Sequence, residues 1–71
     1  MNVEKMKRFM KERGLTAAEM AQVVGINEST WFRKINRNGD TLTVREMNLI
    51  IHAFGIAKSE AAEIFFNEKL A

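Results

Sequence analysis

At 71 residues the chain has room for one domain only, which we expect to span residues 1–71. With no cysteine and a single histidine, neither a disulfide framework nor a metal cluster is expected, and no other cofactor is indicated. The net charge is only +2, no apolar run approaches membrane-spanning length, and the N-terminal residues lack the apolar core of a signal peptide, so we expect a cytoplasmic protein.

The first predicted element is a helix from Val3 to Arg13. Asn2 stands where it can cap the N-terminus of this helix. Gly14 is expected to end it, because glycine enters the left-handed conformation of a helix C-terminus without steric cost, and Leu15 would make the hydrophobic contact of a Schellman ending. Apolar side chains recur at helical spacing along one face, at Val3, Met6, Phe9 and Met10.

Residues 16–37 are predicted to form two short helices joined by a tight turn. Thr16 and Glu19 have the spacing of a capping box, which marks the start of the first of these helices. Gly25 marks its end. Because two helices joined by so short a turn must nearly touch, the small side chain of Ala21 suits their crossing point.

The second helix of the pair is placed at Glu28–Asn36, continuing towards Arg37. Asn27 can cap its N-terminus. Trp31 and Ile35 lie one turn apart and define the face that we expect to be buried.

Two more helices are predicted in the last third of the chain. The first runs from Val44 to Phe54, with Thr43 and Glu46 as a second capping box and Gly55 as its end. The last begins at Lys58 or Ser59 and runs to Lys69. Their expected core-facing residues are Met47, Ile50, Ile51 and Phe54, then Ala61, Ile64 and Phe65, with Ile56 buried between the helices. The sequence therefore predicts an all-α fold.

The two-helix stretch resembles the helix-turn-helix of the phage repressor and Cro family, the lambda-repressor-like DNA-binding domains. The residues that carry the resemblance are Leu15-Thr16, the pair Ala21 and Gly25, Ile26, the pair Ser29-Thr30, and Arg33. The flanking helices fit the same layout, so the resemblance covers nearly the whole chain. It implies a compact five-helix domain that places residues 28–36 in the major groove of duplex DNA.

The distribution of charge agrees with this interpretation. Up to Arg45 the chain holds nine of its eleven lysines and arginines but five of its nine acidic residues. A basic half that contains the helix-turn-helix is typical of a surface that faces a polyanion. The alternative is an ordinary solvated surface of mixed charge.

The resemblance implies which side chains would contact base edges. On the face opposite Trp31, the guanidinium of Arg33 matches O6 and N7 of guanine. Phe32 lies on the flank of the helix, where it would contact a thymine methyl group unless it is partly buried in the core or exposed by chance. Ser29 can either bond a base or help to cap the helix. The predicted base-contacting residues are Glu28, Ser29, Phe32 and Arg33.

Phosphate contacts are expected on both sides of the groove. Family members often have glutamine at the position of Ala17, so a phosphate contact there would come from the backbone amide or be absent. The predicted phosphate-contacting residues are Thr16, Ala17, Asn27, Thr30, Lys34, Asn36, Arg37, Asn38 and Arg45.

The final helix has more apolar residues than one small core needs. Ala62, Phe66 and Leu70 form a strip that we expect to be the interface of a homodimer, because a two-fold partner with the same strip would bury it. The alternative is that Phe66 folds back onto Ile56 or Phe54 and completes the core of the monomer.

These observations favour a sequence-specific transcriptional regulator of double-stranded DNA, a phage or mobile-element repressor that reads a palindromic operator on the nucleoid. The alternative is a protein-interaction module, such as an antitoxin-like helical domain. No small-molecule ligand is indicated, and an enzyme is not expected, because one histidine and no cysteine or tyrosine leave no nucleophile–base pair to propose.

Overall fold

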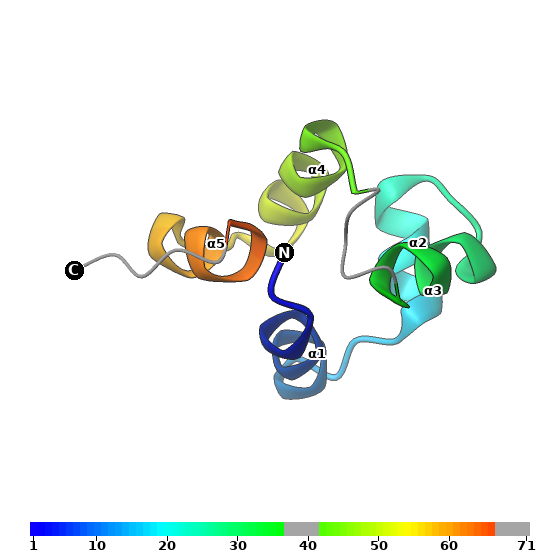
Figure 1. The fold of residues 1–71 in the computed structure, drawn as a ribbon, viewed down its shortest axis with the longest axis horizontal. Coiled ribbons are helices and arrows are strands. Elements are labelled where there is room, and N and C mark those ends of the chain that lie inside the picture. The colour runs from blue at the N-terminus through cyan, green and yellow to red at the C-terminus, as the bar shows by residue number, and fades with distance from the viewer. Residues whose placement is uncertain (37–41, 67–71) are drawn as a thin grey trace.

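The computed structural model describes residues 1–36 and 42–66 of the chain. Those residues contain no strand and form five helices (Figure 1). In chain order these are α1 (Val3–Glu12), α2 (Ala17–Val24), α3 (Glu28–Asn36), α4 (Val44–Phe54) and α5 (Lys58–Phe65). The predicted all-α, five-helix fold is confirmed.

Four of the helices begin at a side-chain cap that the sequence predicts, at Asn2, Thr16, Asn27 and Thr43. The side chain of Asn2 accepts a hydrogen bond from the Lys5 amide at the start of α1. Thr16 at the start of α2 and Thr43 at the start of α4 each form a complete capping box with the glutamate three residues on. Each box satisfies amide groups that have no partner within the helix, which is why these helices start where they do.

Gly25 ends α2 and turns the chain towards α3. Its φ of +76° lies in the left-handed region, where a residue with a Cβ would be strained. The Ile26 amide donates to the Ala21 carbonyl at 3.0 Å, and the Gly25 amide donates to the Gln22 carbonyl at 3.2 Å. These two bonds are the Schellman pattern, and they fix the direction of the turn. The same pattern closes α1 at Gly14.

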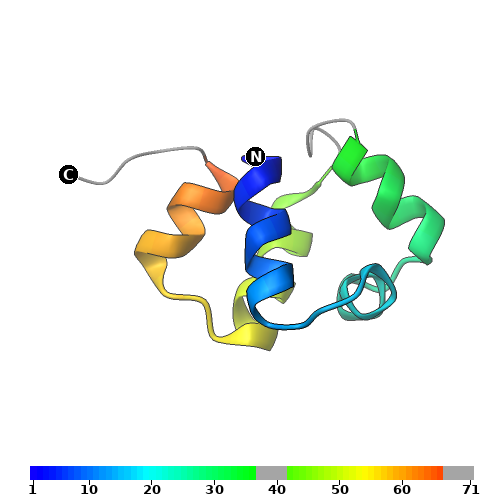
Figure 2. The same ribbon diagram turned by 90° about the horizontal axis from the view of Figure 1, so that it is seen from below.

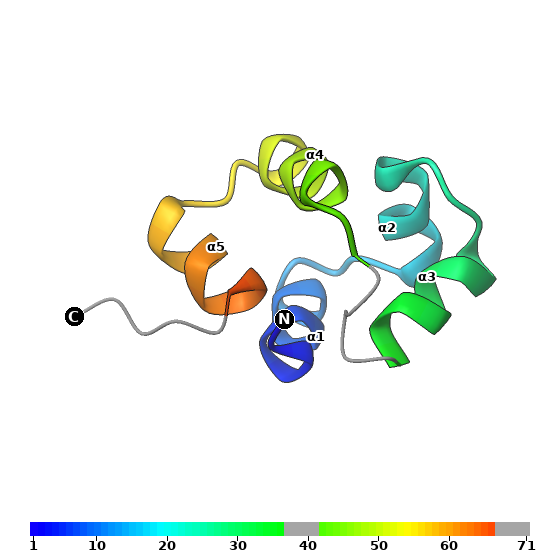
Figure 3. The same ribbon diagram turned by 45° about the horizontal axis from the view of Figure 1, so that its top comes forward.

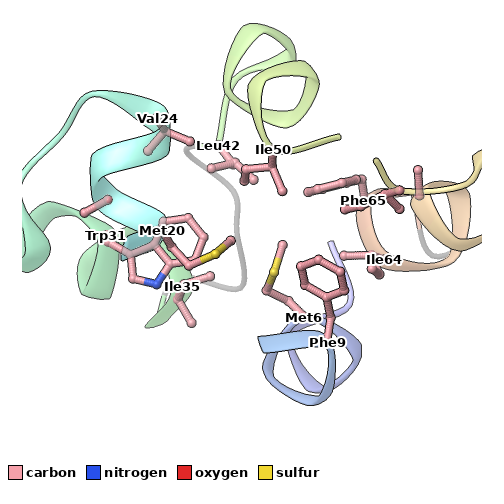
Figure 4. Packing of buried hydrophobic residues seen from close by; sticks show 13 residues of the cluster. Met6, Phe9, Met20, Val24, Trp31, Ile35, Leu42, Ile50, Ile64 and Phe65 are labelled. Carbon is pink, nitrogen blue, oxygen red and sulfur yellow. The ribbon is translucent and has the colours of Figure 1, made fainter. Parts of the chain in front are cut away.

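One apolar core joins all five helices. Figure 4 shows Trp31 and Ile35 of α3 beside Met20 of α2, while Met6 and Phe9 of α1 face Ile64 and Phe65 of α5. Trp31 is 1% exposed, as predicted for a core residue. Of the residues predicted to face the core from α4, Ile50 is fully buried, whereas Met47, Ile51 and Phe54 are half-buried and pack against the cluster.

Polar contacts tie α1 to its neighbours. The Asn2 amide donates to the Ile64 carbonyl at 2.7 Å, which fixes the start of the chain against α5. Arg13 donates to the Phe54 carbonyl at 2.8 Å, and its guanidinium lies 4.8 Å from the centre of the Phe9 ring. Arg13 therefore satisfies a carbonyl at the end of α4, a group that has no partner within the helix.

The last helix is shorter than predicted. The sequence predicts a helix to Lys69, but α5 ends at Phe65, and Phe66 follows as its C-cap. Phe65 is the last side chain of this helix that reaches the core, and Phe66 is 56% exposed. The rest of the predicted helix, residues 67–69, lies outside the described residues.

The helices form two groups. α2 packs against α3 and α4, and α1 packs against α5. Figures 1, 2 and 3 all show α3 at one end of the long axis of the molecule and α5 at the other, with α1 and α4 between them. The two surfaces predicted to bind DNA and a second copy of the chain thus lie at opposite ends.

Candidate nucleic-acid interface

The candidate interface is built on the crossing of α2 and α3. Ala21 is 2% exposed, and its small side chain lets the two helices approach closely near the turn. Gly25 and Ile26 form the turn, with Ile26 half-buried against the core. The two-helix geometry predicted from the sequence is therefore present.

The core fixes which face of α3 is directed outwards. Trp31 and Ile35 are buried at 1% and 5% exposure, so the opposite face of the helix is presented to solvent. All four predicted base-contacting residues are exposed on α3: Glu28, Ser29, Phe32 and Arg33. Phe32 is 49% exposed, and the alternative that it belongs to the core is not supported. The outward face thus carries one acidic, one hydroxyl, one aromatic and one guanidinium group.

The start of α3 is held by a compact set of hydrogen bonds. The Asn27 side-chain oxygen accepts from the Thr30 amide at 2.8 Å and from the Ser29 hydroxyl at 2.8 Å. The Thr30 hydroxyl oxygen accepts from the Arg33 guanidinium at 3.2 Å. Asn27 is therefore the predicted cap of α3, and Ser29 takes part in that cap.

The predicted phosphate-contacting residues differ in how accessible they are. Thr16, Asn27, Asn36 and Arg45 are exposed, whereas Ala17 and Thr30 are half-buried. The Thr16 hydroxyl accepts from the Glu19 amide, and the first amides of α2 have no partner within the helix, so they remain available to a phosphate oxygen. The predicted contacts of Arg37 and Asn38 lie outside the described residues.

Lys34, predicted to contact a phosphate, forms an ion pair within the domain. Its ammonium group forms an ion pair with the Glu46 carboxylate at 3.1 Å, and the two side chains are only 15% and 11% exposed. The pair joins the C-terminal half of α3 to the first turn of α4, next to Arg45. Lys34 thus holds α3 in place from within the domain.

Glu46 has a lowered pKa because several groups stabilise its charge. Burial by itself raises the pKa of this carboxyl, but the Thr43 amide at 2.8 Å and the Lys34 ammonium more than offset burial and hold the pKa below its usual value. Glu46 therefore remains ionised while it caps α4 and binds α3.

The sequence reasoning missed this second role of Glu46. The capping box was visible in the sequence because its members are three residues apart. The partner Lys34 lies twelve residues away on another helix, and no spacing rule links the two. Lys5 and Arg13 also join helices to one another at the surface: Lys5 pairs with Glu63 at 3.4 Å, and Arg13 binds the Phe54 carbonyl. These two cations account for part of the basic character counted in the N-terminal half of the chain.

The family comparison now decides the class of the protein. The family model for the Cro/C1-type HTH DNA-binding domain matches residues 5–65, which include all five helices except the start of α1. The chain belongs to this family. It is a DNA-binding regulator of the helix-turn-helix kind, and α3 is the second helix of the two-helix motif. No curated protein and no solved structure matches the chain significantly.

Within residues 1–36 and 42–66, no group of three or more His, Cys, Asp or Glu side chains is arranged to hold a metal ion. No helix in the described part of the chain is long and apolar enough to cross a membrane.

Proposed function

We propose that this protein is a sequence-specific repressor that inserts α3 into the major groove of duplex DNA, of the kind encoded by phages and mobile elements. The observation that carries the proposal is the outward face of α3, where Ser29, Phe32 and Arg33 are exposed while Trp31 anchors the opposite face in the core. A helix held in this way can present several side chains to base edges at once. Such a protein works in the cytoplasm, on the chromosome.

The bases would be read mainly by Arg33, supported by phosphate contacts around it. Its guanidinium can donate two parallel bonds to O6 and N7 of guanine. Arg45 at the start of α4 and the first amides of α2 would bind phosphates and set the register of α3 in the groove. Phe32 would lie against a thymine methyl group.

The proposal is tested by selecting bound duplexes from a random pool and then titrating salt. We expect a defined consensus, and an affinity that falls steeply between low and physiological salt, because cations that bind phosphates displace condensed counterions. Binding without sequence preference, or with a flat salt dependence, would instead favour the antitoxin-like interaction module, whose main partner is a protein.

Alanine substitutions of Arg33 and Arg45 form a matched pair that distinguishes a base contact from a phosphate contact. Arg33→Ala should lose about 1–3 kcal/mol on the selected site and relax the preference at one base pair. Arg45→Ala should weaken binding to all sequences about equally, since phosphate contacts carry no sequence information. It should also reduce the slope of log affinity against log salt concentration by about one. Equal effects of the two variants on selected and random DNA would contradict the assignment of Arg33 to a base.

We also propose that the protein binds a palindromic operator as a homodimer through α5. Phe66 is 56% exposed and Ala62 is half-buried one turn before it, whereas Ala61, Ile64 and Phe65 are directed into the core. A second copy would cover this apolar strip by a self-complementary contact. The third predicted interface residue, Leu70, lies outside the described residues.

A further inference from the structure

The start of α3 contains a chain of hydrogen bonds that leads from its cap to its principal base-reading residue. Asn27 accepts from the Thr30 amide at 2.8 Å. The accepting atom of Asn27 is its side-chain oxygen, Oδ1. The Ser29 hydroxyl donates to the same oxygen at 2.8 Å, so the cap is held from two sides.

The next bond in the chain reaches Arg33. The Thr30 hydroxyl oxygen accepts from one terminal nitrogen of the Arg33 guanidinium at 3.2 Å. A guanidinium has five N–H donors in a rigid plane, so a single bond at one corner leaves enough donors for a bidentate contact with guanine. Thr30 is half-buried and lies on the helix one turn before Arg33, so it can support the guanidinium from the side.

We propose that Thr30 is a positioning residue for Arg33: its hydroxyl holds the guanidinium in the orientation that reads guanine before DNA binds. The inference rests on the proposed function, since it assigns a preparatory role to a neighbour of the base-reading residue. It also gives Thr30 a role other than the phosphate contact predicted from the sequence.

The physical consequence is a smaller entropic cost of recognition. A long arginine side chain has several rotatable bonds, and their freedom is lost when it binds a base. A side chain already restrained in the free protein loses less on binding, so the specific contact becomes stronger. The effect applies only where Arg33 meets its preferred base, because non-specific binding does not depend on that orientation.

The first test needs no DNA. In nuclear magnetic resonance spectra of the full chain, a hydrogen-bonded guanidinium should show slowed rotation and separate terminal N–H signals for Arg33. Thr30→Val removes the hydroxyl but keeps the branched shape and leaves the capped amide in place, and it should restore fast rotation. Thr30→Ser keeps the hydroxyl and should retain the slowed rotation. Fast rotation in the unmodified protein would overturn the proposal.

The second test measures discrimination on the selected site, as the ratio of affinities for that site and for a version with the Arg33-contacted guanine pair replaced by adenine–thymine. Thr30→Val should reduce this ratio about two- to tenfold, the range of one ordinary hydrogen bond, and leave affinity for random DNA unchanged. Thr30→Ser should preserve the ratio, and Thr30→Val should add nothing in an Arg33→Ala background.

The outcomes separate the two proposals. If Thr30→Val weakens selected and random DNA alike, Thr30 binds a phosphate and the positioning role is wrong. If Arg33→Ala changes discrimination but Thr30→Val does not, the positioning role is wrong and the proposed function stands. If Arg33→Ala leaves discrimination unchanged, the proposed reading by Arg33 fails, and the rotation of its guanidinium still decides whether Thr30 holds it.

Discussion

The two ends of the molecule are stabilised in opposite ways. At one end, α3 begins with the side-chain cap of Asn27, carries an outward polar face and is fixed underneath by Trp31. At the other end, α5 begins at Ala57 with no side-chain cap and leaves Phe66 exposed after its last turn. Figure 2 shows both ends in one view, with α1 between them.

This difference indicates what kind of partner each end of the monomer is suited to bind. The polar side chains at the start of α3 hydrogen-bond to one another, Trp31 and Ile35 are covered by α2 and the core, and Phe32 is 49% exposed beside these polar groups. The end of α5 presents an aromatic ring to water, which is unfavourable by the transfer free energy of its apolar surface. We infer that the α3 end is ready for a charged, hydrated ligand such as DNA, whereas the α5 end is suited to an apolar partner.

The largest expected effect comes from removing the anchor of the α3 end. Trp31→Ala leaves a cavity between α2, α3 and the core, and should lower the free energy of unfolding by about 3–5 kcal/mol. A loss of this size is enough to unfold many domains this small. The measurement is a urea or thermal unfolding curve of the variant.

The control for this variant lies next to it in the chain. Phe32→Ala removes a similar aromatic group that is 49% exposed, so the unfolding midpoint should change little while DNA binding weakens. Equal destabilisation by both variants would contradict the orientation of α3.

Much of the α3 end could be predicted from the sequence, because its structure depends on contacts between residues close in the chain. The capping box at Thr16, the left-handed Gly25 and the cap at Asn27 all join residues three or fewer positions apart, or depend on one residue's backbone conformation. The buried position of Trp31 followed from helical spacing together with the resemblance to the helix-turn-helix motif.

What could not be predicted depends on residues that only the fold brings together. Lys34 was predicted to bind phosphate because it lies near the C-terminal end of α3, and the fold pairs it with Glu46. Arg13 was counted with the basic surface, but its guanidinium binds the end of α4. The C-terminal end of α5 depends on where packing stops, and the apolar residues after Phe65 gave no sign of that point.

The second expected effect concerns the α5 end. Phe66→Glu should leave the domain folded, because Phe66 contributes little to the core, and should abolish the proposed dimer. Each Phe66 that a partner fully buries would contribute about 1.5–3 kcal/mol to association. Sedimentation should show a monomer, and the advantage of a full palindromic site over a half site should disappear.

Leu49→Glu is the control for the added charge. Leu49 on α4 is another exposed apolar residue, at 36%, and lies outside the proposed interface. The Leu49→Glu substitution should leave the sedimentation of the protein unchanged. If Phe66→Glu unfolds the domain, Phe66 belongs to the core, and if it leaves sedimentation and full-site binding unchanged, the dimer does not use this strip.

The smallest expected effect is a pH dependence from the contact that joins α3 to α4. The pKa of Glu46 is lower in the folded protein than in the unfolded chain, so the unfolded state binds more protons as the solution is acidified. The contribution of Glu46 to the free energy of unfolding is therefore fully present above the ordinary glutamate pKa of about 4.3. It is lost as the pH falls through the lower pKa that Glu46 has in the folded protein.

Glu46→Gln tests this dependence, because glutamine keeps an oxygen for the Thr43 amide but loses the charge that pairs with Lys34. We expect a loss of about 1 kcal/mol near neutral pH, the size of one partly buried charged contact, and a smaller decline in stability on acidification. Glu19→Gln is the matched control, since Glu19 occupies the same place in the other capping box and forms no ion pair with another described residue. Unfolding curves between about pH 3 and pH 6 compare the variants across the range where a glutamate titrates. If both substitutions reduce the loss of stability at low pH equally, the effect belongs to capping boxes in general. The ion pair between Lys34 and Glu46 then makes no separate contribution to the pH dependence.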